Sequence, residues 1–285
     1  MNIIDYDPHV LWSIAITVLA GAAAGGLGAM LGIGGAIFLI PVLNVGLSVP
    51  LFPSQSVSLV TVVGTSMSVS AAPESRRLVN GRLAMVLLIC SVGGALTGVH
   101  ALTRLVSERD AERVFGITAL AIAAVMLMRL DRRNVLAVGE VDVGALGGRF
   151  TDSDSGRDVT YRVRRLPIAL GGSFVAGVIS SIAGVGGGIV IVPLLNSLCG
   201  VPLRAAAATS SFMIGVTAVP GIIGHYQLGH FTRPELAAAA VLGVLAGTRS
   251  GLWLSHRAPV RSLKLFMAAL LLLVGGFYLF AGRAA

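Results

Sequence analysis

The sequence predicts an all-α, polytopic membrane protein made of two homologous repeats, and three observations carry this prediction. The chain of 285 residues is 55% hydrophobic, with a mean hydropathy of +0.88, and only 12% of it is charged, whereas soluble domains carry about 25% charged residues. Apolar runs close to the roughly 20 residues that cross a bilayer recur throughout the chain. In addition, the phrase GIGGAIFLIPVLN at 32–44 returns 152 residues later as GVGGGIVIVPLLN, with seven of its thirteen positions identical.

The first half opens with one long apolar region, residues 10–46, which glycines interrupt at 32–35. As a single helix this region would extend about 55 Å at 1.5 Å per residue, although the hydrocarbon core is only about 30 Å thick. We therefore expect a first helix that is discontinuous or re-entrant. Three full-length transmembrane segments follow it, at 54–72, 83–105 and 111–128.

The second half repeats this plan. Its broken apolar region covers 166–198, with the interruption at 184–188, and three further segments cover 203–224, 235–254 and 262–281. Val49-Pro50 also returns as Val201-Pro202, and a gap of four residues aligns Thr61 with Thr209. Two repeats with discontinuous helices are the plan of many secondary transporters.

The number of crossings in each half decides how the repeats are related. Four crossings per half would make them parallel, and five would make them inverted. Five crossings with the N-terminus outside place 15 Lys and Arg residues in cytoplasmic segments and 5 outside, against 13 and 7 for four crossings with the N-terminus inside. Because cytoplasmic loops carry an excess of basic residues, this count favours inverted repeats.

We expect three parts: an N-terminal transmembrane repeat at 1–128, a polar cytoplasmic linker at 129–165 and a C-terminal transmembrane repeat at 166–285. In the linker, DVTYRVRRL at 158–166 alternates polar and apolar residues, which is typical of a short strand. The linker is either a solvated tether or a small regulatory or partner-binding module. Because the arginines lie between apolar runs, the net charge of +8 reflects orientation in the membrane and does not indicate nucleic-acid binding.

The chemistry available inside the membrane suits an anion. No Asp or Glu lies in the middle of an apolar segment, although proton-coupled carriers usually place a carboxylate there. Glycine-rich breaks leave backbone N–H groups free at the start of the following helix, where the helix dipole favours negative charge. The backbone candidates for binding an anion are Gly34, Gly35, Gly186, Gly187 and Gly188. The alternative is close helix packing, to which we assign the small-xxx-small patterns at 21–25, 28–32, 243–247 and 247–251.

Several polar side chains are candidates for the same site, and each has a structural alternative. An amide in an apolar run needs a partner, so Asn44 and Asn196 either bind substrate or cap helices. Hydroxyls either donate to an anion or bond to their own helix. Arg249 is a counter-charge or snorkels toward an interface. The full set of side-chain candidates is Asn44, Gln55, Thr61, Asn196, Thr209, Ser210 and Arg249.

His225 and His230 flank Gly229 near the end of a segment. They are interfacial residues or have a gating or pH-sensing role. Neither glycine break continues into the Lys-Ser/Thr of a P-loop, and no metal-ligand spacing is present, so we predict no cofactor and no metal.

These motifs resemble the TauE/SafE sulfite exporter family, also called the toluene sulfonate uptake permease group. The resemblance rests on the duplicated glycine phrase, AATS at 207–210 and HYQLGHF at 225–231, and covers nearly the whole chain except the linker. The first phrase has Ala36 where the second has Gly188, and VVGTS at 62–66 leaves open which threonine of the first half is functional.

The resemblance implies a permease, not an enzyme, for sulfur-containing anions such as sulfite, sulfoacetate or other sulfonates, frequently moving outward. We expect it in the inner membrane of a bacterium, with alternating access around the paired breaks and with a homodimer as the assembly to test. The alternatives are an anion channel, a carrier of another small carboxylate anion and an intramembrane enzyme.

Overall fold

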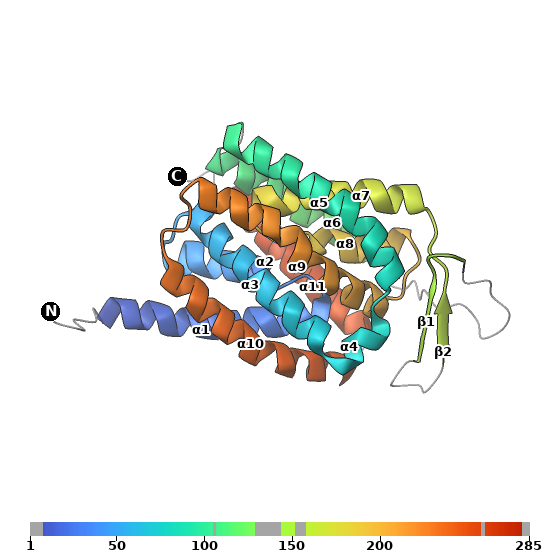
Figure 1. Cartoon of the computed structure of the whole chain (residues 1–285). Coiled ribbons are helices and arrows are strands. Elements are labelled where there is room, and N and C mark those ends of the chain that lie inside the picture. The colour runs from blue at the N-terminus through green and yellow to red at the C-terminus, as the bar shows by residue number, and fades with distance from the viewer. Residues whose placement is uncertain (1–7, 105–106, 129–143, 152–157, 258–259, 281–285) are drawn as a thin grey trace.

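The computed structural model describes residues 8–104, 107–128, 144–151, 158–257 and 260–280, which form a bundle of helices with a short β-hairpin at one end (Figure 1). Within these residues five helices are long and apolar enough to cross a membrane, and three shorter apolar helices accompany them. The protein is therefore a multi-pass, mostly helical membrane protein, as the hydropathy predicts.

The first half contains the broken segment and the helices that follow it. Helix α1 spans Pro8–Leu31, and after the glycines the short helix α2, Ala36–Pro41, continues into a π-helical turn, η1, Val42–Gly46. The remaining helices are α3 (Leu51–Ala71), the short α4 (Pro73–Leu78), α5 (Gly81–Arg104) and α6 (Glu108–Met128).

The second half contains the same elements in the same order, except for a counterpart of α4. They are α7 (Leu166–Ala183), α8 (Gly188–Pro193), the π-helical turn η2 (Leu194–Leu198), α9 (Leu203–Gln227), α10 (Pro234–Arg257) and α11 (Val260–Phe280). Each π turn begins directly after a proline, Pro41 or Pro193. Because proline has no N–H to donate, the helical hydrogen bonds slip there, and Leu47 and Cys199 each bond to the carbonyl five residues before them, at 3.2 Å.

The chain turns back after each glycine break. In Figure 1, α1 and α3 both run toward the hairpin end of the bundle, and α2 with η1 returns between them. The same end brings together Met30 of α1 and Val69 of α3, so the segment that connects the two helices must come back. The broken first segment is therefore re-entrant: 36–46 is too short to span the bilayer by itself. It still reverses the direction of the chain, so α3 starts at the same end as α1 and the order of directions is that of the five-crossing plan.

Each first helix packs along a helix of the other half. Gly25 of α1 faces Val244 of α10 so closely that a β-carbon on Gly25 would lie 2.7 Å from the Val244 carbonyl oxygen. In the same way, Gly98 of α5 faces Val178 of α7, with 2.6 Å to its carbonyl oxygen. The glycines at 21, 25, 243, 247 and 251 all lie in the α1–α10 contact, which confirms the prediction that these small-xxx-small patterns serve helix packing.

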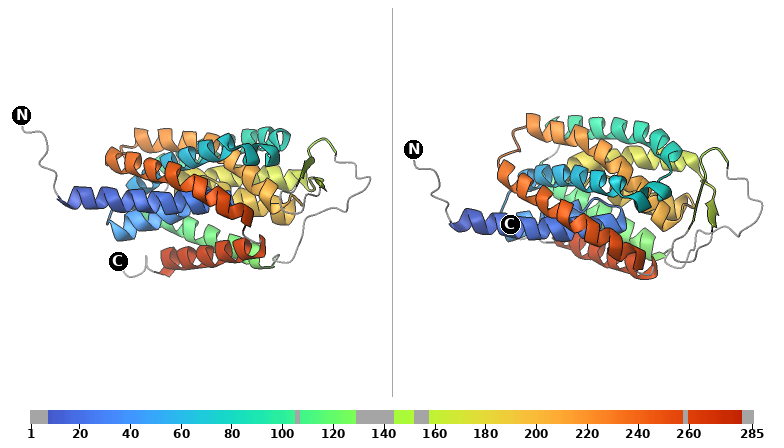
Figure 2. Two further views of the ribbon diagram at one scale, coloured as in Figure 1. Left: turned by 90° about the horizontal axis from the view of Figure 1, so that it is seen from below. Right: turned by 60° about the horizontal axis from the view of Figure 1, so that its bottom comes forward.

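Helices that take the same place in the two halves run in opposite directions. Helices α3 and α9 lie side by side, with Leu59 near Gly221 and Ser66 near Gly215, so they are antiparallel. Helices α6 and α11 meet through Gly116 and Gly275 and also run in opposite directions (Figures 1 and 2).

The hairpin consists of β1 (Gly148–Thr151) and β2 (Asp158–Tyr161), paired antiparallel. The alternation at 158–166 correctly predicts a strand, although the strand ends at Tyr161. Figure 2 shows the hairpin at the end of the bundle away from the start of α1. Arg149 pairs with Asp158 at 2.7 Å on the exposed side of the hairpin.

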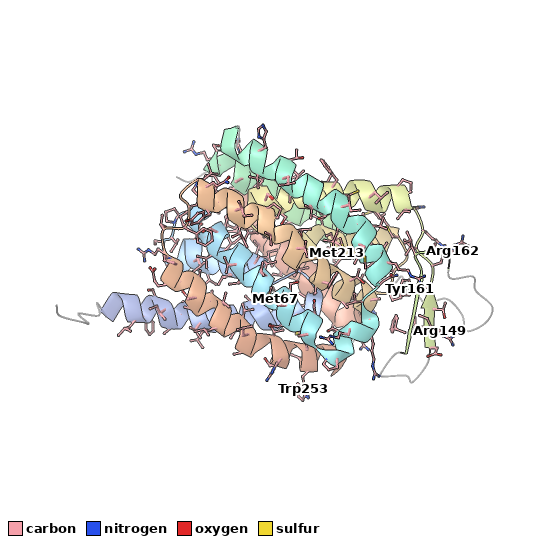
Figure 3. All side chains as sticks on the ribbon, viewed as in Figure 1. Met67, Arg149, Tyr161, Arg162, Met213 and Trp253 are labelled. Carbon is pink, nitrogen blue, oxygen red and sulfur yellow. The ribbon has the colours of Figure 1, made fainter. Side chains whose placement is uncertain are left out.

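The hairpin is docked on the bundle through its apolar side. Phe150, Val159 and Tyr161 are buried in one apolar cluster with residues of the helices, and Figure 3 shows Tyr161 where the hairpin meets the helices. The amide of Asn80 donates to the Leu146 carbonyl at 2.8 Å and to the Tyr161 hydroxyl at 3.2 Å. Burial raises the pKa of Tyr161 above its ordinary value, and the hydrogen bond from Asn80 opposes this shift. This part of the linker is therefore held against the membrane-embedded helices.

Candidate functional site

Two glycine breaks form the centre of the molecule. We call Gly32–Ala36 the first break and Gly184–Gly188 the second. In the first break Gly32, Gly34 and Gly35 have φ of 72°, 82° and 77°, and in the second the matching glycines at 184, 186 and 187 have 69°, 76° and 64°. Because L-residues with a side chain rarely adopt this conformation, both turns require glycine at these positions.

The two breaks touch each other. A β-carbon on Gly188 would lie 2.8 Å from the Gly32 carbonyl oxygen and 2.9 Å from the Ile33 α-carbon. Both segments are fully buried. Backbone from the two halves therefore meets in the interior, without side chains between Gly188 and Gly32.

Each break is covered by a helix of the other half: α9 covers the first break, and α3 covers the second. Gly32 lies against Ala207 of α9, and Gly184 lies against Gln55 of α3. Positions 55 and 207 are separated by the same 152 residues as the breaks themselves. Each break is thus covered by the same position of the helix from the other half.

Val62 and Ile214 fill the space between the breaks. A β-carbon on Gly34 would lie 2.8 Å from Ile214 Cδ1, and one on Gly186 would lie 2.6 Å from Val62 Cγ1. These two positions are also 152 residues apart. Helices α3 and α9 therefore match residue for residue at this offset, without the four-residue gap that aligns Thr61 with Thr209. Thr65 and Thr217 are then equivalent, rather than Thr61 and Thr209.

Several backbone donors at the breaks are unused. Among the described residues no backbone acceptor is present for the N–H groups of Gly35, Ala36 and Ile37, nor for those of Gly187 and Ile189. These groups are buried, and a buried backbone donor without a partner is costly. They are the groups that an anion or water entering the breaks would satisfy.

The threonines of α3 and α9 have different surroundings. The Thr65 hydroxyl shares its proton between the Gly34 carbonyl at 3.3 Å and the Thr61 carbonyl at 2.9 Å, so it contacts the first break. Thr61 donates to the Ser58 carbonyl of its own helix at 2.7 Å. Thr209 accepts a hydrogen bond from the Asn80 N–H at 3.0 Å and thereby joins α9 to the start of α5. Of the threonine candidates in the first half, Thr65 is the one that reaches the break.

Some buried polar atoms near the breaks have no hydrogen-bond partner in the described part of the chain. They include Gln55 Oε1, Ser180 Oγ and Ser210 Oγ. Gln55 packs on Gly184, and Ser180 lies beside Gly187, with its Cβ 3.6 Å from a β-carbon placed there. Ser180 is a candidate that the sequence analysis did not select: it lies only seven residues before Gly187, but the turn of the chain at the break decides which side of α7 faces that glycine. Ser210 is fully buried and keeps its place among the candidates.

Asn44 and Asn196 close the loops that follow the π turns. Asn44 Nδ2 donates to the Val49 carbonyl at 2.9 Å, and Asn196 Nδ2 donates to the Val201 carbonyl at 3.0 Å. The two bonds are equivalent in the two halves. Both asparagines thus have the structural role, at the end of a helical segment, that the sequence offered as the alternative to substrate binding. A contact with substrate stays a prediction for both residues.

Arg249 lies on the exposed outer face of α10. Trp253, one helical turn later, is also exposed and points away from the bundle (Figure 3). The glycines of α10 that face inward, Gly247 and Gly251, pack on α1. The position of Arg249 matches the snorkelling alternative, and it does not bring the guanidinium to the breaks.

A small pocket opens at the hairpin end of the bundle, which we call the linker face. Its volume is about 40 Å³, and it lies between the ends of α1, α3 and α10 and the start of α9. Arg204 and Ser75 line it, together with Ala207, which covers Gly32. The pocket therefore reaches from the linker face toward the first break and carries one positive charge.

At the opposite face, Phe52, His225 and His230 form a cluster of rings, here the histidine cluster, one helical turn of α3 away from the residue that packs on the second break. Phe52 occupies the position in α3 that Arg204 occupies in α9, and its ring stacks on His230 with centroids 4.7 Å apart. One turn further along α3, Gln55 lies on Gly184. The pocket and the histidine cluster thus take corresponding places on the two faces.

Comparison with known proteins agrees with these features. The family model described as "Sulfite exporter TauE/SafE" matches residues 17–278. This chain belongs to the TauE/SafE family. The names of the family and of the similar proteins indicate a membrane transporter rather than an enzyme.

Similar TauE/SafE chains come from distant organisms. The chain is 26% identical over 277 residues to the probable membrane transporter protein YunE of Bacillus subtilis, covering 95% of this chain and 98% of that protein. It is 26% identical to a probable membrane transporter protein of Haemophilus influenzae, covering 92% and 96%. It is 21% identical to the probable membrane transporter protein MJ0441 of Methanocaldococcus jannaschii, covering 97% and 99%. No solved structure shows a significant match.

Proposed function

We propose that this TauE/SafE protein is a permease for sulfur-containing anions such as sulfite and sulfonates, and that it works by alternating access. The observation that carries the proposal is the contact between the two glycine breaks, Gly188 against Gly32. It brings unused backbone donors from both halves to one buried place. Backbone N–H groups of this kind bind oxyanions, and no carboxylate from an apolar segment competes there.

The two halves act as inverted repeats in this proposal. The antiparallel course of α3 and α9, and of α6 and α11, supports this relation. If the halves rock against each other, Val62 and Ile214 separate, and the breaks open to one face at a time. The arrangement described above has a pocket on the linker face and the histidine cluster closing the other face, which suits a form that opens toward the linker.

The proposed direction is outward, across the inner membrane of a bacterium, with the linker face in the cytoplasm. A membrane potential that is negative inside drives an anion outward by about 2.3 kcal/mol per charge per 100 mV. Arg204 in the pocket would favour anions at the cytoplasmic entrance. A homodimer is the assembly that we expect.

Purified protein in liposomes tests the proposal. Saturable counterflow of radiolabelled sulfite or a sulfonate, with weaker exchange of carboxylates of equal charge, is the expected result. Ohmic anion currents in a planar bilayer would instead indicate a channel. A preference for carboxylates or cations over every sulfur oxyanion would overturn the assignment of substrate.

A further inference from the structure

We propose that His225 and His230 form a proton-binding site that keeps the face opposite the linker closed while one proton is shared between the two rings and opens that face when both rings are protonated. The inference rests on the proposed function, because it supplies a proton-controlled gate for the same path. Its evidence is the geometry of the histidine cluster and its place one helical turn from Gln55, which packs on the second break.

The turn after α9 folds His230 back onto His225. The His230 N–H donates to the His225 carbonyl at 3.0 Å, and the Gly229 N–H donates to the Tyr226 carbonyl at 3.1 Å. Gly229 has φ of 72°, which allows this tight reversal. As a result, His225 Nδ1 and His230 Nδ1 lie 2.9 Å apart.

A contact between two ring nitrogens at this distance needs one proton between them. One imidazole donates Nδ1–H and the other accepts with its lone pair. If both rings become imidazolium ions, two N–H donors and two positive charges face each other, and the contact cannot persist. The closed arrangement therefore persists while a single proton lies between the two Nδ1 atoms, and it is lost when both rings are protonated.

His225 is fully buried; its Nε2 makes no hydrogen bond of ordinary geometry among the described residues, and the backbone of Ser181 is the polar group that lies beside the ring. A proton that binds there would create an unsolvated charge in the interior, which is costly. Opening of the cluster exposes the ring to water and removes this cost. Protons therefore bind the open form better than the closed form, and a ligand that does so shifts the equilibrium toward the open form.

The histidine cluster holds two halves of the protein together. Phe52 of α3 stacks on His230, with an angle of 10° between the rings. The Ser56 hydroxyl lies 3.2 Å from the His230 carbonyl and 2.7 Å from the Pro53 carbonyl of its own helix, so the two carbonyls share its proton. On the other side, Ser181 of α7 donates to the Ala95 carbonyl of α5 at 2.9 Å and lies next to Gly221 of α9. Separation of the histidines would thus release α3 from the end of α9.

No described ionisable side chain is buried beside the pair. Helices α3 and α7 contribute Phe52, Ser56 and Ser181 to its surroundings. Other described ionisable side chains occur at the end of α5, at the start of α6, in the α9–α10 loop and at the start of α10. All of them are exposed or half-buried: His100, Arg109, Asp110, Glu112, Arg113, Arg233 and Glu235. An imidazole released into water titrates near pH 6.5, so the pair responds between about pH 5.5 and about pH 8.

Electron paramagnetic resonance can detect this opening without any substrate. Nitroxide labels at Val45 and Thr232, both exposed at this face, would be attached in a Cys90→Ser, Cys199→Ala background and measured in nanodiscs at about pH 5.5 and about pH 8. We expect a longer distance population at the lower pH. That population should be lost in His225→Gln and in His230→Gln, and kept in His100→Gln, the matched control. If His225→Gln does not fold, His230→Gln decides, because its ring is less buried.

Transport of an alkyl sulfonate, which stays ionised over this pH range, tests the coupling. We expect its counterflow to rise by up to about tenfold per unit fall in pH, which is the steepest dependence that binding of one proton can give. In both glutamine variants the counterflow should become independent of pH. Distances and transport rates that do not change with pH, or that change equally in the glutamine variants, would overturn the proton site. A pH-dependent distance change without transport of any sulfur anion would instead keep the proton site and refute the proposed function.

Discussion

Gly188 of the second break lies directly against Gly32 of the first, so that a β-carbon on Gly188 would be 2.8 Å from the Gly32 carbonyl oxygen. The corresponding residue of the first phrase is Ala36, which is fully buried. The two breaks are therefore not interchangeable, and the closest backbone approach between the halves depends on the glycine of the second.

Replacement of Gly188 by alanine should damage both packing and transport. The added methyl group meets backbone, which cannot rotate away, so we expect a loss of about 1–3 kcal/mol of stability and little remaining counterflow. Gly171→Ala in α7, where a β-carbon meets nothing within 4 Å, is the matched control and should change stability by about 0.5–1 kcal/mol in the favourable direction. Thermal unfolding in detergent and liposome counterflow measure the two effects, and equal behaviour of the two variants would contradict the expectation.

Valine at Gly34 or Gly186 should abolish transport while the protein still inserts into the membrane. The φ values of 82° and 76° are strained for a β-branched residue, and the side chain would also strike Val62 and, at Gly34, Ile214. Full activity of both variants would show that the breaks do not line the substrate path. Gly93→Val, at a position of α5 with open space, controls for the effect of valine itself.

Gln55 and Ser180 should matter for transport more than for stability. Because Gln55 Oε1 and Ser180 Oγ have no partner in the described part of the chain, Gln55→Leu and Ser180→Ala should change stability by less than about 1 kcal/mol. Both residues contact the second break, so we expect a raised KM for sulfite in each variant. Ser173→Ala is the control, since that hydroxyl is also buried without a partner but lies two turns earlier in α7. A KM change in Ser173→Ala as large as in Ser180→Ala would argue against a specific role.

Asn80 should hold the hairpin on the bundle. Its side chain bonds to Leu146 and Tyr161 and accepts a hydrogen bond from the Leu83 N–H at 3.1 Å. We expect Asn80→Ala to cost about 1–3 kcal/mol and Tyr161→Phe about 0.5–1.5 kcal/mol, with non-additive effects in the double variant. Limited proteolysis between 144 and 165 measures release of the hairpin.

The pH dependence of this docking follows from the pKa of Tyr161, which burial raises. A raised pKa means that the folded state favours the neutral phenol. Docking is therefore fully stable below the ordinary tyrosine pKa of about 10 and weakens as the pH rises above it. Tyr161→Phe should remove this alkaline dependence, and proteolysis that stays pH-dependent in the variant would contradict the assignment.

Arg249→Gln should leave transport close to that of the unchanged protein. The side chain is exposed on the same face as Trp253 and does not reach the breaks. A severe loss of counterflow, with normal membrane insertion, would instead support the counter-charge interpretation.

Local sequence features determined much of the architecture. Hydropathy alone located the five described helices that are long and apolar enough to cross a membrane, because burial in lipid depends on the length and composition of each run. The predicted full-length segments at 54–72, 111–128 and 262–281 are not among these five. The glycine phrases marked the positions of both breaks, because a left-handed backbone conformation selects glycine residue by residue. The repetition of the whole plan after 152 residues pointed to two equivalent halves and, through its motifs, to the TauE/SafE family.

The tertiary structure decided which residues meet. That the chain turns back after each break, that Thr65 rather than Thr61 contacts Gly34, and that Gln55 lies on Gly184 all depend on how one half docks on the other. The same holds for Phe52 and His230, which come from different halves. The sequence by itself predicted each half, since hydropathy and backbone preference are local properties. The site lies between the halves and forms only when the helices of each half pack on the glycine break of the other.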